Sequence, residues 1–173
     1  MRIGDRLLFL RYALPCASTL VRRGVISQDQ VNRMITLVSK NQLPPEGAES
    51  IFKVANAMCT IIARRMGKRL IDDEVIRQYF LMEHSKVVDD RFSLMKDFDP
   101  TDCRTYAGKV VKVNKDTALV KTSLGEKKYR TIFARDVKEN DDVAVHFNFI
   151  VERVPDQILK RIKEDNKEIA DER

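Results

Sequence analysis

The side chains in this sequence that could ligate a metal or act as nucleophiles are three cysteines and two histidines. Cys16, Cys59 and Cys103 are far apart and no Cys-x-x-C pair occurs, so their spacing predicts neither a structural zinc site nor a disulfide framework. Cys59 lies inside an apolar helical stripe, and we expect it to be a small core residue. His146 lies on the polar side of a predicted strand, where a histidine is usually solvated or hydrogen-bonded.

Motifs typical of enzymes are missing from the sequence. It contains no glycine-rich phosphate loop, no H-E-x-x-H and no G-x-S-x-G, and His84 and His146 are its only histidines. The paired carboxylates Asp89-Asp90 and Asp141-Asp142 are typical of solvated helix and turn positions. We therefore name no catalytic residue and expect a protein that is not an enzyme.

The composition indicates a globular protein. Of the 173 residues, 43% are hydrophobic and 34% are charged, which excludes a disordered chain. No apolar run approaches the roughly 18 residues that cross a bilayer. The first apolar stretch is interrupted by Arg11, unlike the core of a secretory signal. We therefore expect one ordinary domain or two small ones, in the cytoplasm and without membrane attachment.

The net charge of +6 is unevenly distributed along the sequence. Residues 1–98 hold 16 Lys and Arg against 11 Asp and Glu, whereas residues 99–173 hold 16 against 15. A modest basic excess of this kind suits nucleic acid or an acidic protein partner without choosing between them. Arg64 and Arg65 lie near the end of a predicted helix, where the last carbonyls favour cations. A phosphate-binding patch is the other interpretation.

The first half of the sequence has a helical period. An apolar segment at residues 7–13 is expected to end before Pro15, because proline cannot continue the backbone ladder. Ser27 and Gln30 have the spacing of a capping box, in which each side chain satisfies a backbone amide of the other. Apolar residues then recur three and four positions apart, which predicts a one-sided helix.

Two further helices are predicted before residue 98. Glu46 opens a segment whose apolar stripe runs over residues 51–62 and ends at Gly67, a plausible helix stop. Asp72 can cap the next helix, and the pattern leaves open whether that helix continues past His84. Residues 1–98 are therefore predicted to form an all-α domain.

The period changes from 3.6 to 2 after a turn-like segment at residues 97–102. In the last predicted strand, the odd-numbered residues from Val143 to Val151 form an apolar face. His146 lies on the opposite, polar face, which Ile150 interrupts. The predicted strands span residues 108–113, 117–122, 127–133 and 143–151.

Strands this short, in about 50 residues, cannot bury the core of a sandwich. A small closed or half-closed barrel of the OB-like type removes exposed edges most economically. Pro155 then begins a charged C-terminal helix. The predicted fold class is α+β, in which an N-terminal all-α domain (residues 1–98) precedes an OB-like β-barrel with a C-terminal helix (residues 99–173).

In the second half of the sequence Cys103 is followed by four residues, then by Gly108, Lys109 and a predicted strand. This order of residues resembles that of the HypC/HupF family of nickel–iron hydrogenase maturation chaperones. The resemblance covers about 70 of the 173 residues and keeps order and spacing throughout. Further matching segments are residues 116–120, like the second strand of the family, residues 136–138, like its last loop, and residues 142–152, like its last strand with its histidine at His146.

This resemblance implies a chaperone that works with a second maturation factor and with the precursor of the hydrogenase large subunit. It also implies an iron centre bearing cyanide and carbon monoxide. The family's cysteine contacts iron and the partner protein, a role that falls here on Cys103, with His146 as the matching histidine and with Gly108 and Lys109 beside them. In the family the cysteine becomes the N-terminal residue, whereas Cys103 is internal and its nitrogen is an amide.

A second hypothesis is binding of RNA or single-stranded DNA, because small barrels commonly hold such strands. Few aromatic residues are available for base stacking, and Tyr106 and Tyr129 are the main candidates. A steep salt dependence of RNA or heparin binding would favour this hypothesis over a chaperone role. The basic residues that support it are Lys109, Lys112, Lys121, Lys128 and Arg130.

Overall fold

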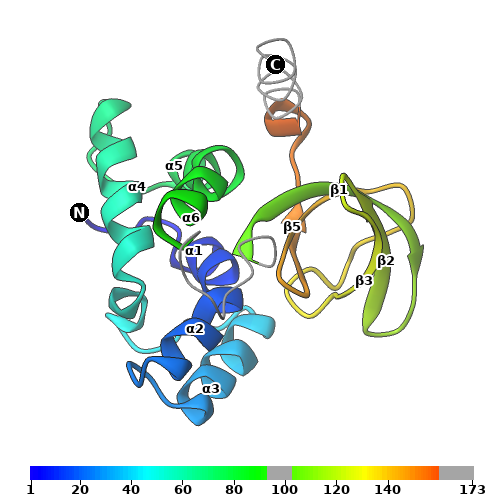
Figure 1. The fold of residues 1–173 in the computed structure, drawn as a ribbon, viewed down its shortest axis with the longest axis horizontal. Helices are drawn as coiled ribbons and strands as arrows, with labels where there is room; N and C mark the ends of the chain where they lie inside the picture. Colours follow the sequence, from blue (N-terminus) through cyan, green and yellow to red (C-terminus); the bar gives the residue numbers. More distant parts are fainter. Residues whose placement is uncertain (93–102, 160–173) are drawn as a thin grey trace. The chain divides into compact units, whose positions relative to one another are not determined.

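The computed structural model describes residues 1–92 and 103–159, which form two compact units (Figure 1). Unit 1 is Met1–Phe80 and unit 2 is Leu81–Arg173. The turn-like segment predicted at residues 97–102 lies outside the described residues. The sequence-based domains therefore stay a prediction, while the division into compact units falls between Phe80 and Leu81.

Unit 1 is built from helices, as the sequence predicts. α1 ends at Ala13, before Pro15, which confirms that prediction, and a short 3₁₀ turn that contains Pro15 follows it. Glu46 does not open the third helix, which begins at Lys53 after a second 3₁₀ turn. The elements are α1 (Arg6–Ala13), η1 (Leu14–Cys16), α2 (Ala17–Arg22), α3 (Gln28–Ser39), η2 (Ala48–Ile51), α4 (Lys53–Arg65) and α5 (Asp73–Arg77).

Local capping signals in unit 1 are confirmed. The Ser27 side chain accepts a hydrogen bond from the Gln30 amide, and the Gln30 side chain accepts one from the Ser27 amide. Asp72 caps α5 by accepting from the Val75 amide at 3.0 Å. Cys59 is fully buried in α4, as expected for a core thiol.

The chain continues in helical form beyond α5, which answers the question that the sequence pattern left open. A π-helical segment, η3 (Gln78–Glu83), leads directly into α6 (His84–Phe92). A π-turn inserts a residue into the helical ladder and rotates every later side chain around the helix axis. His84, the first residue of α6, is buried at 5% exposure.

The second half of the chain forms a five-stranded closed barrel, β1-β2-β3-β5-β4, in which β4 pairs back onto β1 (Figure 1). This confirms the change from helices to a sheet, while the OB-like assignment stays a prediction. A helical turn at residues 156–159 follows the barrel, and later positions lie outside the described residues. The strands are β1 (Thr105–Val113), β2 (Thr117–Thr122), β3 (Gly125–Arg130), β4 (Asp142–His146) and β5 (Phe149–Arg153).

The prediction of one long last strand is wrong. A two-residue turn at Phe147 and Asn148 divides it into the antiparallel pair β4 and β5. The turn reverses the chain, so Val145 pairs with Ile150 and both side chains enter the barrel core. Ile150, which interrupted the predicted polar face, is therefore a core residue. His146 is fully buried on the other face of β4 and hydrogen-bonded there, so the second of the two expected states, solvated or hydrogen-bonded, is the one found.

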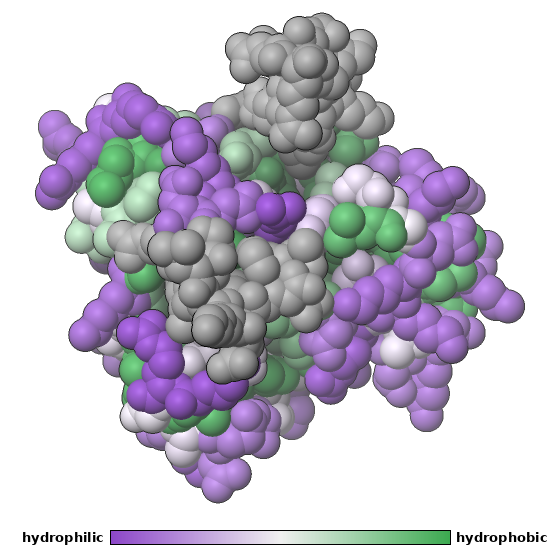
Figure 2. All heavy atoms as spheres, viewed as in Figure 1, coloured by the Kyte–Doolittle hydropathy of each residue, from purple (hydrophilic) through white to green (hydrophobic). Residues whose placement is uncertain are grey.

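Hydrophilic side chains cover much of the surface drawn in Figure 2, in keeping with the 34% of charged residues. Some large apolar side chains are exposed as well, and Leu124 in the β2–β3 turn is 64% exposed. In the described part of the chain, every helix is too short or too polar to cross a bilayer.

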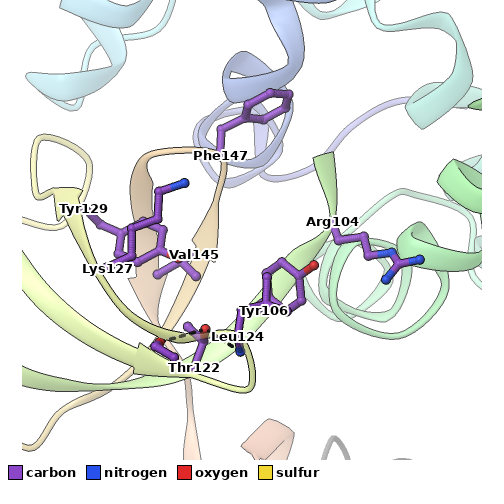
Figure 3. A pocket seen from close by; sticks show the side chains of 9 residues that line it. Arg104, Tyr106, Thr122, Leu124, Lys127, Tyr129, Val145 and Phe147 are labelled. Carbon is purple, nitrogen blue, oxygen red and sulfur yellow. Dashed lines mark hydrogen bonds between the residues drawn. The ribbon is translucent and has the colours of Figure 1, made fainter. Parts of the chain in front are cut away.

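One end of the barrel opens into a pocket beside the β2–β3 turn (Figure 3). Side chains from the beginning of β1, from β3 and from the β4–β5 turn line it. The most prominent of them are Arg104, Tyr106, Leu124, Lys127, Tyr129 and Phe147.

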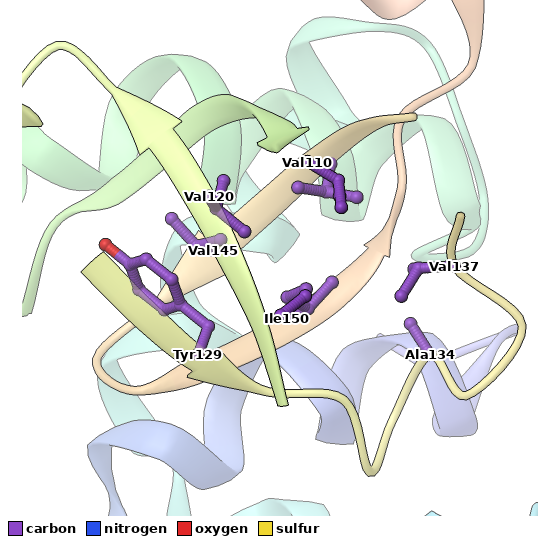
Figure 4. Packing of buried hydrophobic residues seen from close by; sticks show 9 residues of the cluster. Val110, Val120, Tyr129, Ala134, Val137, Val145 and Ile150 are labelled. Carbon is purple, nitrogen blue, oxygen red and sulfur yellow. The ribbon is translucent and has the colours of Figure 1, made fainter. Parts of the chain in front are cut away.

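The interior of the barrel is filled by alanine and β-branched side chains together with the ring of Tyr129 (Figure 4). Branched side chains fit the pleated inner surface and fill a narrow barrel without voids. The core residues are Val110, Ala118, Val120, Tyr129, Ala134, Val137, Val143, Val145 and Ile150.

Gly108 allows β2 to approach β1 closely. A Cβ atom at this position would lie 2.7 Å from Val120 Cγ1 and 2.9 Å from the Lys121 carbonyl oxygen. The carbonyl belongs to the paired strand and cannot move away without disturbing the ladder. The structure thus gives this glycine a packing role, whatever its part in partner binding.

Replacing Gly108 with alanine is expected to lower the free energy of unfolding by about 1–3 kcal/mol, the cost of forcing an extra carbon into a packed interior. Urea unfolding of the barrel measures this. Lys112→Ala, an exposed position on the same strand, is the control and should change stability by less than about 0.5 kcal/mol. Equal stability of the two variants would show that β2 moves aside.

Candidate metal-binding site

Three side chains with metal-ligating atoms meet in unit 2. They are His84 at the beginning of α6, Cys103 just before β1 and His146 at the end of β4. Their ligand atoms all lie within 4.8 Å of one another. All three residues are buried, with exposed fractions of 5%, 5% and 0%. The group could therefore hold a metal ion away from bulk water.

Pairing between β1 and β4 brings Cys103 to His146. Thr105 pairs with His146 in the antiparallel ladder, and Cys103 lies two residues before Thr105. The His146 ring nitrogen Nε2 donates a hydrogen bond to the Cys103 carbonyl oxygen at 2.8 Å. Because a carbonyl can only accept, Nε2 carries the proton and the lone pair lies on Nδ1 in the neutral ring. This hydrogen bond therefore selects the tautomer that ligates through Nδ1.

Helix α6 supplies the second imidazole. The rings of His84 and His146 lie with centroids 5.1 Å apart in an edge-to-face arrangement. Within the same unit, Arg104 donates two hydrogen bonds to Asp89 of α6, at 2.6 and 3.1 Å. Both partners are about one-third exposed or more, so this ion pair adds little stability. The ion pair instead positions the site, because it holds the residue next to Cys103 against the helix that carries His84.

Burial keeps His84 in the form that binds metals. Loss of hydration lowers the pKa of His84, and the neighbouring His146 acts in the same direction, whereas a hydrogen bond with Cys103 and its charge raise it. The net effect is a pKa below the ordinary value of 6.5. The imidazole is therefore neutral at neutral pH and ready to donate a lone pair.

Acid is expected to destabilise the metal-free unit 2 through His84. Below about pH 6.5 the unfolded chain binds a proton that the folded chain excludes, because burial lowers the pKa of the folded state. The free energy of unfolding then falls as the pH falls, by at most about 1.4 kcal/mol per pH unit. Urea unfolding between about pH 8 and about pH 5 measures the slope. His84→Gln should remove this contribution, and an unchanged slope would contradict it.

One thiolate and two imidazoles form a donor set for a transition metal. Thiolate and imidazole together suit zinc, copper and iron, whereas hard cations such as Mg²⁺ prefer oxygen. Bonds of about 2.0–2.1 Å to nitrogen and about 2.3 Å to sulfur would place tetrahedral ligands roughly 3.3–3.6 Å apart. In the present arrangement the ligand atoms all lie within 4.8 Å of one another.

The structure brings together only some of the residues that the sequence nominated. Cys103 and His146 meet, whereas Gly108 packs against β2 and Lys109 is exposed on β1 with an ion pair to Asp142 at 3.0 Å. The residues of the nucleic-acid hypothesis are exposed on the outer surface of β1, β2 and β3, where paired residues such as Lys109 and Lys121 share a face. They are Lys109, Lys112, Lys121, Lys128 and Arg130.

Sequence reasoning gave His84 no role. It lies 19 positions before Cys103 in a segment with a helical period, so no local spacing connects the two residues. The only signal was its identity as one of two histidines in the chain. Comparison with known proteins adds no assignment for this group: no protein-family model matches the chain, and no curated protein matches it in sequence.

Proposed function

We propose that this protein is a non-enzymatic assembly factor that carries a transition metal and resembles hydrogenase maturation chaperones. The observation that supports it best is the convergence of His84, Cys103 and His146 within 4.8 Å in a buried setting. Two of these residues are those that the sequence resemblance marks for an iron centre. The third adds an imidazole donor from a helix of the same unit.

The donor set fits an iron cargo. A soft thiolate suits low-spin iron, and imidazole is a common additional ligand. Such iron would bring cyanide and carbon monoxide as ligands of its own. Burial of the donor atoms is compatible with an oxygen-sensitive cargo. The iron is here a substrate for delivery, which is consistent with the lack of enzyme motifs in the sequence.

The partners in this proposal are proteins. By resemblance they are a second maturation factor and the precursor of a hydrogenase large subunit, recognised by the barrel, in the cytoplasm. A thiol-bound cargo requires a reducing compartment, because an oxidised cysteine loses its thiolate.

Anaerobic purification with bound partners tests the proposal. Iron analysis and infrared spectroscopy of the full chain should reveal bound iron with cyanide and carbonyl bands. Cys103→Ala should lose both signals, whereas Cys59→Ala, which removes a buried thiol in unit 1, should retain them. Iron and bands that persist in Cys103→Ala, or a wild-type protein from a hydrogenase-producing cell without either, would refute the iron role.

A further inference from the structure

The pocket at the end of the barrel combines three aromatic rings with the cationic side chain of Lys127 (Figure 3). Tyr106, Tyr129 and Phe147 come from β1, β3 and the β4–β5 turn. The ammonium group of Lys127 lies 5.8 Å from the centre of the Tyr129 ring and points into the space beside it. Arg104 also lines the pocket, and its guanidinium group is hydrogen-bonded to Asp89. Flat apolar walls with a cation at the edge suit a planar ligand that carries negative charge.

Phe147, which lines this pocket, has a strained backbone conformation. It has a φ of +54°, whereas Asn148 after it does not have a positive φ, the pattern of a turn that favours glycine at its first position. A bulky residue at positive φ is uncommon and costs on the order of 1 kcal/mol or more. The side chain is only half-buried and lines the pocket. Strain of this kind is typical of residues that are held for binding.

The charge around the pocket favours a phosphate over a cationic or neutral ligand. Strands β1 to β3, residues 105–130, hold seven Lys and Arg against two Asp and Glu, a net charge of +5. Among them Lys127 differs in position. It pairs with Val120, a core residue, so its side chain leaves from the inner face of the sheet towards the pocket. The other basic residues extend the positive field over the neighbouring outer surface.

We propose that this pocket binds a nucleobase and its adjoining phosphate. The base stacks on the rings of Phe147 and Tyr106, and the phosphate lies near Lys127. Stacking accepts any base, because every base has a π-face, so the site is expected to be tolerant of sequence. The ligand is a free nucleotide or one unit of a single-stranded nucleic acid, and both present the same chemistry. This inference is independent of metal binding.

Fluorescence anisotropy with a labelled eight-nucleotide RNA strand tests the inference, using the full chain in EDTA at low salt. Phe147→Ala and Tyr106→Leu should each weaken binding about 5- to 100-fold, the usual effect of removing a stacking ring. Lys127→Gln should reduce the slope of log affinity against log salt by about 0.7, as for one lost phosphate contact. Lys115→Gln, in the β1–β2 turn at the opposite end of β2, is the charge-matched control and should retain the affinity of the wild type.

Further binding measurements identify which part of the nucleotide the pocket recognises. An abasic strand of equal length should bind at least about fivefold more weakly than the RNA. Competition by a mononucleotide identifies a free nucleotide as the ligand, and competition only by strands identifies a single-stranded nucleic acid. Equal binding of the abasic strand or of polyglutamate would overturn the inference. So would unchanged affinity in both folded ring variants, or the absence of RNA binding at about 50 mM salt.

Discussion

Replacing Cys103 with serine is expected to weaken Zn²⁺ binding by more than about 100-fold. Removing a residue that only supports a ligand typically costs 10- to 100-fold in affinity, so removing the thiolate itself should cost more. The imidazoles of His84 and His146 remain, but the site loses the anionic thiolate of Cys103. Competition with a chromophoric chelator measures the affinity. Co²⁺ as a substitute should show a thiolate-to-metal charge-transfer band that the variant lacks.

Controls separate ligation from general damage to the fold. Cys59→Ala removes a buried thiol from α4 and should leave the affinity and the cobalt band unchanged. His84→Gln and His146→Gln should each weaken binding, with circular dichroism used to confirm that the variants are folded. A wild-type affinity in folded Cys103→Ser would exclude the thiolate as a ligand and remove the basis of the proposed site.

The second large effect expected is local protection by the metal. Zn²⁺ at about 1,000 times its dissociation constant stabilises the folded state by about 4 kcal/mol, if it binds only that state. Amide hydrogen exchange should slow in α6, at the beginning of β1 and at the end of β4, because these segments carry the ligands. Exchange in α3, whose capping and packing lie within unit 1, should stay the same.

Mass spectrometry of peptides after exchange, with and without Zn²⁺, measures this protection. The His146→Gln variant provides the comparison, since it keeps the chain and the zinc but removes one ligand. Slower exchange in wild type alone supports a site built from these segments. Equal slowing in both proteins, or slowing spread over all of the described helices, would indicate that zinc binds elsewhere.

Local features of this fold could be predicted from the sequence, because short-range chemistry determines them. The capping box at Ser27 and Gln30 and the cap at Asp72 depend on side chains within three residues of the amides they satisfy. The change from helices to strands follows from a change in hydrophobic period. All the residues that produce these signals lie close together in the sequence.

The last hairpin could not be predicted in this way. Residues 143–151 alternate so regularly that they read as one strand, and no glycine marks the turn. The turn forms at Phe147 despite its strained φ, because the β4–β5 pairing and the core position of Ile150 outweigh the local preference. Tertiary packing here overrides the local signal.

The candidate metal site was only half visible in the sequence. The resemblance nominated Cys103 and His146, and the β1–β4 register places them together. His84 required knowledge that α6 lies against the barrel within unit 2 and that a π-turn precedes it. Helix-to-strand packing over such a separation leaves no trace in periodicity. A metal site whose ligands come from different secondary-structure elements can therefore be recognised only in the three-dimensional structure.

The joint between β3 and β5 has a mechanical consequence for the barrel. These two strands are parallel and share one registered pair, Arg130 with Phe149, whereas the neighbouring antiparallel ladders have several. Local opening of a folded protein begins where the fewest bonds must break at once. Local opening of the barrel should therefore begin between β3 and β5, while the ladders that β1 forms with its neighbours stay paired.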